Sequence, residues 1–254
     1  MNLIRLFLAL AIVGLTGCAT RASNPADPLE SFNRGVYKFN DTLDKAVAKP
    51  VAQGYEKIMP DTGKILVTNF FSNLNDVIVT VNDLLQLKLT QGFSDGMRVL
   101  VNSTIGIGGL VDVASMHLDR HNEDFGQTLG YWGLKSGPYL MLPIFGPSSF
   151  RDSVGLYVDS YTSVIYRVPN MRTRNQLYLT QMIDQRAQLL TDEKVMEGAI
   201  LDRYAFIRDA YLQRRQNLVY DGNPPHDPYE DEPEDAPADA PAPPPAAPAT
   251  KPTP

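Results

Sequence analysis

Residues 136–152 read SGPYLMLPIFGPSSFRD, and the middle of this stretch is strongly apolar. It cannot form a regular helix, because a proline inside a helix removes a backbone hydrogen bond and its ring clashes with the preceding turn. We therefore expect a rigid apolar loop or hairpin. Its candidate functional residues are Pro138, Tyr139, Leu140, Leu142, Pro143, Phe145, Gly146 and Pro147. Such a loop is either buried or in contact with lipid, since an exposed apolar patch this dense needs a partner.

The segment just before the loop is rich in glycine. Within residues 125–137, glycines occupy positions 126, 130, 133 and 137. A glycine inside a helix costs about 1 kcal/mol relative to alanine. Four of them in thirteen residues therefore indicate that another part of the backbone approaches closely.

Apolar residues recur at helical spacing on both sides of this region. A first helix is predicted from Asp27 to Pro50, with Asp27 and Glu30 as a capping box and Pro50 as its stop. Its apolar stripe consists of Phe32, Val36, Phe39, Leu43 and Val47.

Further helices are predicted over about 66–85, 94–105 and 172–190, and a last one from Thr191 or Asp192 onward. The helix over 94–105 is expected to end at the glycines of 106–109. The helix over 66–85 is expected to be interrupted near Asn75-Asp76. Strict alternation of apolar and polar residues is rare, so the fold class is all-α, in a single domain.

The helical stripes have two interpretations. Periodicity alone favours helices that pack into a soluble core, but amphipathic helices lying in a membrane show the same pattern. The candidate membrane-facing stripe is Phe32, Val36, Phe39 and Leu43. After the N-terminal segment no run of 18 apolar residues occurs, and a transmembrane helix in the usual sense is not predicted.

The N-terminus has the features of a bacterial lipoprotein precursor. Arg5, an apolar run from Leu6 to Leu15 and small residues before Cys18 are typical of a secretory signal. Cys18, the single cysteine, follows Leu15-Thr-Gly in a sequence that resembles the lipobox, at which the signal is cut and the cysteine acylated. An ordinary signal peptide with a chance cysteine is the alternative. We expect residues 1–17 to be the signal and 18–26 a lipidated linker.

The C-terminal residues 221–254 are dominated by Pro, Ala and acidic side chains. Such a segment cannot bury enough apolar surface to fold, and we expect a disordered tail after a domain of residues 27–220. The tail and Arg5 together account for the overall charge of −6, because residues 18–220 carry equal numbers of acidic and basic side chains. The body thus has no bulk attraction to nucleic acid, and membrane insertion would depend on apolar surface.

The sequence gives little support for catalysis. Gly146-Pro-Ser-Ser-Phe150 does not match the Gly-x-Ser-x-Gly nucleophile elbow. His117 and His121 are four residues apart and could share a metal on a helix, but a polar loop is the favoured interpretation. The glycines of 106–109 lack the Lys-Ser/Thr of a phosphate loop. No catalytic residue, metal or cofactor is predicted, and the protein is not expected to be an enzyme.

Several motifs, taken in order behind the lipobox, resemble the VacJ/MlaA lipoproteins of Gram-negative outer membranes. They are DPLESFNR (27–34), NFFSNL (69–74), VNDLLQ (81–86), FGQTLG (125–130), the opening stretch 136–152 and RAQLL (186–190). The resemblance covers roughly residues 27–216. This chain has Asn75-Asp76-Val77 where many relatives have an acidic residue followed by proline, and its tail is longer than the family core requires.

The resemblance implies a ring of amphipathic helices in the inner leaflet of the outer membrane, anchored by lipid at the periplasmic face. A channel through the ring would accept phospholipids from the outer leaflet and pass them to a soluble periplasmic carrier, beside a trimeric porin. It places residues 138–147 in a hairpin near the channel. Ala19, rather than Asp, after the lipidated cysteine agrees with outer-membrane sorting in enteric bacteria.

The sequence leaves three hypotheses for the function of this protein. The leading hypothesis is passive phospholipid translocation that maintains outer-membrane lipid asymmetry. The alternative is a structural lipoprotein that organises porins without conducting lipid. A phospholipase, the third, is disfavoured by the missing nucleophile motif.

Overall fold

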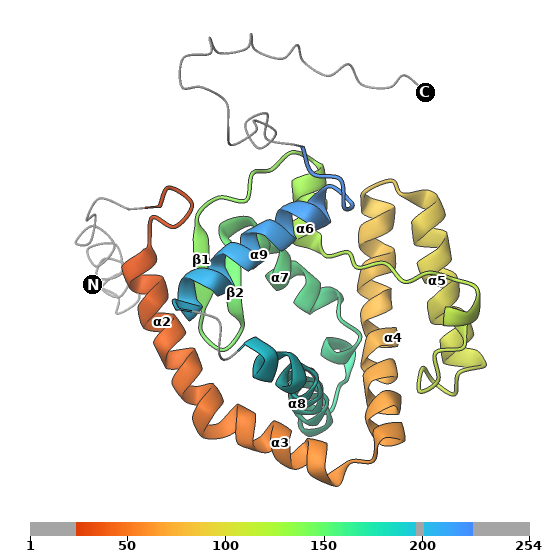
Figure 1. Cartoon of the computed structure of the whole chain (residues 1–254). Coiled ribbons are helices and arrows are strands. Elements are labelled where there is room, and N and C mark those ends of the chain that lie inside the picture. The colour runs from red at the N-terminus through yellow and green to blue at the C-terminus, as the bar shows by residue number, and fades with distance from the viewer. Residues whose placement is uncertain (1–23, 197–200, 226–254) are drawn as a thin grey trace, which may run out of the picture.

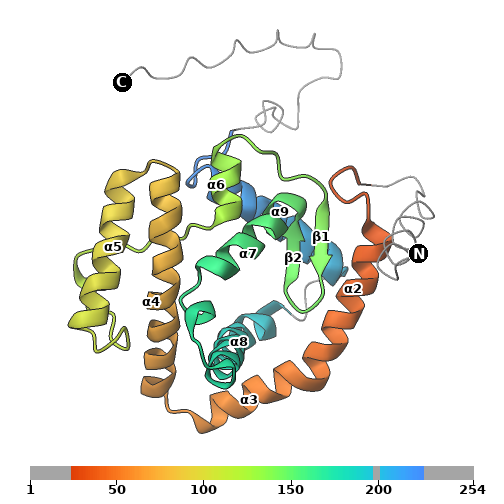
Figure 2. The same ribbon diagram turned by 180° about the vertical axis from the view of Figure 1, so that it is seen from behind.

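The structure is a computed structural model that describes residues 24–196 and 201–225, without the side chains of 191, 192 and 194–196. The predicted signal with Cys18 and the tail beyond residue 225 lie outside the described residues. In both views α2, α3 and α4 follow three sides of a ring-like frame. The remaining side is completed by α6, α9 and a β-hairpin, and α5 lies outside α4 (Figure 1, Figure 2).

The first two sides of the frame are formed by one long, bent helix. It consists of α2 (Glu30–Leu43), a π-helical turn η1 (Asp44–Ala48) and α3 (Lys49–Ile58). The prediction that Pro50 ends the helix is wrong: the π-turn resets the hydrogen-bond pattern, and Pro50 stands in the first turn of α3, where its missing N–H costs little. The predicted capping box is also wrong, because Leu29 is the N-cap and Asp27 is buried.

The opposite side is an antiparallel pair, α4 (Asp61–Leu85) and α5 (Leu89–Thr104). Helix α4 continues without a break through Asn75-Asp76, contrary to expectation. Asp76 is buried and accepts a hydrogen bond from Arg120 Nη2 at 2.7 Å, which compensates its burial. The predicted glycine stop after α5 is confirmed, and Gly108 and Gly109 adopt positive φ.

The central part of the chain contains short elements and the only sheet in the described residues. These elements are η2 (Ala114–Met116), α6 (Phe125–Tyr131), β1 (Tyr139–Leu142), β2 (Gly146–Ser149), α7 (Phe150–Thr162) and η3 (Ile165–Arg167). The close backbone approach predicted from the glycines occurs at Gly126. A Cβ added to Gly155 of α7 would lie 2.3 Å from the Gly126 nitrogen.

The last two helices are α8 (Met171–Met196) and α9 (Arg203–Val219). The expected helix start at Thr191 or Asp192 is wrong, because α8 continues through both positions. Ala187 and Leu190 of α8 pack on Ala52 of α3. Leu179, in the predicted stripe of the same helix, is exposed.

Burial in this fold is inverted relative to an ordinary soluble domain. Among the described residues, polar and charged side chains outnumber apolar ones in the buried set, and many large apolar side chains are exposed. Burial of a polar group is tolerated only where it is hydrogen-bonded. The soluble-core interpretation of the helical stripes is therefore wrong for much of this chain.

Candidate functional site: a cavity at the hairpin

The apolar stretch 136–152 forms the predicted hairpin. Strands β1 and β2 pair antiparallel, with Tyr139 opposite Ser149 and Leu142 opposite Gly146. Residues 143–145 make the tip, and Ile144 in the tip and Gly146 at the start of β2 have positive φ. The alternating pattern buries Tyr139 and Met141, whereas Ile144 and Phe145 at the tip are exposed.

Two asparagines of α2 hold the outer edge of β1. Asn33 Nδ2 donates to the Tyr139 carbonyl at 3.0 Å, and its Oδ1 accepts from the Met141 amide at 2.9 Å. Asn40 repeats this pattern two helical turns later, donating to the Leu142 carbonyl at 2.9 Å and accepting from the Ile144 amide at 2.8 Å. These two side chains take the place of a third strand, because they satisfy the backbone amides and carbonyls along the outer edge of β1.

The buried end of the hairpin is packed against aromatic rings of α9. Tyr139 makes edge-to-face contacts with Tyr204 and Tyr211 at centroid distances of 6.3 and 5.9 Å. The Tyr204 hydroxyl donates to Asp27, which also accepts from Asn33. The base of the hairpin is thus fixed by packing, while its tip is held mainly by Asn40.

A cavity of about 220 Å³ lies between the hairpin, α7 and α9. Its lining residues are Asp124, Leu142, Phe145, Pro147, Ser148, Asp152, Leu156, Asp159, Tyr211 and Arg215. The hairpin supplies most of its apolar surface. Helix α7 turns Asp152, Leu156 and Asp159 towards it, because positions i, i+4 and i+7 share one face of a helix.

Arg215 dominates the charged wall of the cavity. Its Nη2 lies 2.9 Å from Asp124 Oδ1 and 2.8 Å from Asp152 Oδ1. Burial alone would raise the pKa of Asp124 and of Asp152, but the Arg215 guanidinium holds both pKa values below their usual range.

Asp159 differs from the two other carboxylates. Burial raises its pKa to about 6, although it accepts from the Phe125 amide at 2.9 Å and from Asn82 Nδ2 at 3.2 Å. Asn82 Oδ1 in turn accepts from the Thr128 hydroxyl. This network joins α4, α6 and α7, so the polar wall is a rigid surface that faces the apolar hairpin.

The predicted hairpin residues therefore all belong to the hairpin, but only some of them line the cavity. Leu142, Phe145 and Pro147 line the cavity. Tyr139 is buried behind it. Pro138, Leu140, Pro143 and Gly146 are not among the lining residues.

The candidate stripe on α2 is mainly exposed. Phe32 is 60% and Phe39 53% exposed, and Leu43 is also exposed. Val36 differs, because it packs against the cluster of Tyr139, Met141 and Tyr204.

Sequence reasoning missed Asn33, Asn40, Asp159 and Arg215. The asparagines did leave a signal: Asn is unfavourable inside helices, yet two occur seven residues apart within α2. Asp159 and Arg215 left no such signal in the sequence, because they are far apart in the chain and line one cavity only after folding.

The histidine pair does not form a metal site. His121 Nδ1 lies 2.7 Å from Asp95 Oδ2. Within residues 24–196 and 201–225, no group of three or more His, Cys, Asp or Glu side chains is arranged to hold a metal ion.

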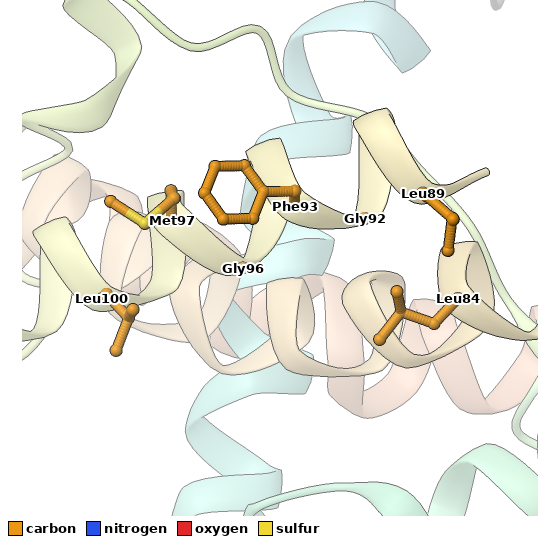
Figure 3. A pocket seen from close by; sticks show the side chains of 7 residues that line it. All are labelled: Leu84, Leu89, Gly92, Phe93, Gly96, Met97 and Leu100. Atoms are coloured by element: carbon orange, nitrogen blue, oxygen red, sulfur yellow. The ribbon is translucent and has the colours of Figure 1, made fainter. Parts of the chain in front are cut away.

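A second hollow, of about 360 Å³, lies on α4 and α5 and is lined by apolar residues and glycine. Figure 3 shows its lining of Leu84, Leu89, Gly92, Phe93, Gly96, Met97 and Leu100. Phe93 is 72% exposed.

Among the described helices, none is both long and apolar enough to cross a membrane.

Known proteins share both the sequence and this architecture. Residues 25–218 match the family described as MlaA lipoprotein. The intermembrane phospholipid transport system lipoprotein MlaA of Escherichia coli K12 is 34% identical over 223 residues, covering 85% of this chain and 88% of that protein. The protein of the same name from Haemophilus influenzae is 31% identical, covering 84% and 89%.

A solved structure is similar as well. It is described as the structural basis for maintenance of bacterial outer membrane lipid asymmetry, and the TM-score is 0.67 at 33% identity, covering 76% of this chain and 98% of that chain. The family match spans the hairpin, the two asparagines and the whole cavity lining. This chain therefore belongs to the MlaA lipoprotein family.

Proposed function

We propose that this protein is an outer-membrane lipoprotein that removes mislocalised phospholipid from the outer leaflet and so maintains lipid asymmetry. It is a transport protein rather than an enzyme. The observation that carries the proposal is the inverted burial, in which apolar side chains face outward and a partly charged cavity lies inside the frame.

The outward apolar surface is suited to acyl chains. Phe32 and Phe39 on α2 and Phe93 on α5 project from separate sides of the frame, and the hollow on α4 and α5 has almost no polar surface. In water, a set of exposed apolar side chains this extensive would be costly and aggregation-prone. In a lipid leaflet the same surface is favourable, so we propose that the frame lies in the periplasmic leaflet with Cys18 as its lipid anchor.

The cavity supplies what a phospholipid needs in order to move. A polar headgroup crosses hydrocarbon only at a high desolvation cost. Asp124, Asp159 and Arg215 offer polar contacts on one wall, while Leu142 and Phe145 of the hairpin offer apolar contacts on the other. Of the candidate hairpin residues, Leu142, Phe145 and Pro147 thus form a wall of the proposed lipid path, and the tip controls its width.

We further propose two protein partners. A soluble periplasmic carrier would receive the lipid, and a trimeric porin would sit beside the frame. The relatives' description as members of a transport system supports a carrier, because a lipid leaving the leaflet must be shielded from water.

The test is to narrow the cavity from α7. Leu156→Trp adds bulk at a lining position, and Val154→Trp adds the same bulk at an exposed position of α7 outside the lining. Cells carrying Leu156→Trp are expected to accumulate outer-leaflet phospholipid as a deletion strain does, whereas Val154→Trp cells resemble wild type. Wild-type lipid levels in Leu156→Trp cells would overturn the proposed path.

The same variants separate transport from the alternative function. A purely structural lipoprotein that organises porins predicts normal lipid asymmetry whenever porin association is intact. We expect Leu156→Trp to co-purify with porin and still lose asymmetry. Loss of both properties together would favour the structural function.

A further inference from the structure

A ladder of tyrosines extends from α7 to η3, away from the cavity lining. The ring centroids of Tyr157 and Tyr161 are 5.0 Å apart, and those of Tyr161 and Tyr166 are 4.9 Å apart. All three side chains are exposed. Tyr157 and Tyr161 occupy the face of α7 opposite Asp152 and Asp159, and Tyr166 lies in η3. None of the three lines the cavity.

Three arginines adjoin this ladder. Arg167 follows Tyr166 in η3, Arg172 lies in the first turn of α8, and the Arg174 guanidinium is 5.9 Å from the Tyr166 ring centroid. We call these arginines and the three tyrosines the tyrosine–arginine patch.

The charge of the patch is not balanced locally. Residues 160–183 contain no Asp or Glu. No ion pair joins the three arginines to a carboxylate in the described part of the chain, although most other arginines there are paired with one, as Arg186 is with Asp44 at 2.6 Å. A body with equal numbers of acidic and basic residues thus concentrates three cations at one corner.

Both residue types fit one kind of partner. The arginine fork matches the oxygens of a phosphate group. Tyrosine has an apolar ring and a polar tip, and it is enriched where hydrocarbon meets water. An acidic protein would satisfy the arginines, but it would leave the exposed apolar residues nearby, such as Met171, without an apolar partner.

We propose that the tyrosine–arginine patch binds the phosphate headgroups of the leaflet in which the frame lies, and so fixes the depth of the protein in the membrane. This inference rests on the proposed function, because the frame must lie in a leaflet for headgroups to reach the patch. It concerns a surface outside the cavity and adds a second, stationary class of lipid contact.

The experiment is hydroxyl-radical footprinting of the full mature lipoprotein, read by mass spectrometry. Labelling of Tyr157, Tyr161 and Tyr166 is compared between dodecyl maltoside micelles and vesicles of phosphatidylethanolamine and phosphatidylglycerol. Exposed Tyr220 is the internal reference. We expect the three tyrosines to be protected in vesicles relative to Tyr220, and the protection to weaken as salt is raised.

The decisive variant is Arg167→Gln/Arg172→Gln/Arg174→Gln, with Arg214→Gln on α9 as the control for an exposed arginine. Each cation near an anionic surface contributes a factor of roughly five in binding. Protection is therefore expected to fall severalfold in the triple variant, to stay unchanged in Arg214→Gln, and to return in part with lysine at all three sites. Low labelling of buried Tyr204 in every variant verifies the fold.

Two results would overturn the inference. Equal labelling of the patch in micelles and vesicles would mean that headgroups do not cover it and would leave it open to a protein. Undiminished protection in the triple variant would mean that the arginines do not hold phosphate. Because the footprint uses purified protein, either result leaves the proposed transport intact, whereas normal lipid asymmetry in Leu156→Trp cells contradicts the transport and not the patch.

Discussion

The two hydrogen bonds between Asn40 and the hairpin tip determine how readily the tip opens. Asn40→Ala removes two hydrogen bonds, to the Leu142 carbonyl and from the Ile144 amide. The base of the hairpin keeps the bonds of Asn33 and the packing of Tyr139. We therefore expect the tip to open locally while the fold survives.

The size of the effect follows from the number of bonds. Each hydrogen bond contributes about 0.5–1.5 kcal/mol net, and the tip is partly exposed, so that water replaces some of the loss. The free energy of opening should fall by about 1–2 kcal/mol in total. This corresponds to a rise in the open population of roughly 5- to 30-fold.

Hydrogen exchange measures this directly. The Ile144 amide is expected to exchange faster by that factor in Asn40→Ala, with the Met141 amide, bonded to Asn33, unchanged. Thr42→Ala is the matched control, since the Thr42 hydroxyl bonds only within its own helix, to the Lys38 carbonyl. An unchanged Ile144 rate would refute the assignment of Asn40 as the clamp of the tip.

Three further predictions concern burial, packing and the anchor. Burial and a neighbouring Asp95 raise the pKa of Asp83 to about 8. An unfolded aspartate ionises near pH 4, so the stability that comes from the neutral folded form is present at about pH 4 and is lost progressively as the pH rises towards about 8. Asp83→Asn should therefore stabilise the protein by roughly 2 kcal/mol at pH 8 and little at pH 4 in thermal melts, and an equal gain at both would contradict this. Gly155→Ala places a Cβ 2.3 Å from the Gly126 nitrogen and should cost about 3 kcal/mol or more in unfolding free energy, whereas Gly35→Ala, with no atom within 4 Å, should be neutral or stabilising. Cys18→Ala, at a position outside the described residues, should release the protein from the outer-membrane fraction while the body still partitions into detergent; retention in the outer membrane would argue against lipid on Cys18.

Much of the secondary structure could be predicted from local pattern. The glycine stop after α5, the close approach at Gly126 and the hairpin in 136–152 follow from the conformational limits of glycine and proline, which act within a few residues. The failures were also local in origin. Pro50 reads as a stop unless the π-turn before it is known, and Asp27 reads as a cap although it is drawn into a buried bond with Asn33.

The candidate site was predictable only in part. The hairpin was found because it is one continuous apolar segment. The opposite wall was not, because Asp124, Asp159 and Arg215 come from three separate places in the chain and look like ordinary solvated charges in sequence.

By itself the sequence determined the helical class and the presence of an apolar hairpin at 136–152, because each depends on neighbouring residues. The precursor signal at Cys18 rests on the same kind of local pattern and stays a prediction. Only the tertiary structure decided which way the helical stripes face. The same 3.6-residue period describes a helix that packs inward and one that faces lipid. In this chain Asn33 and Asn40 bind the hairpin edge from α2, and Phe32 and Phe39 are consequently directed outward.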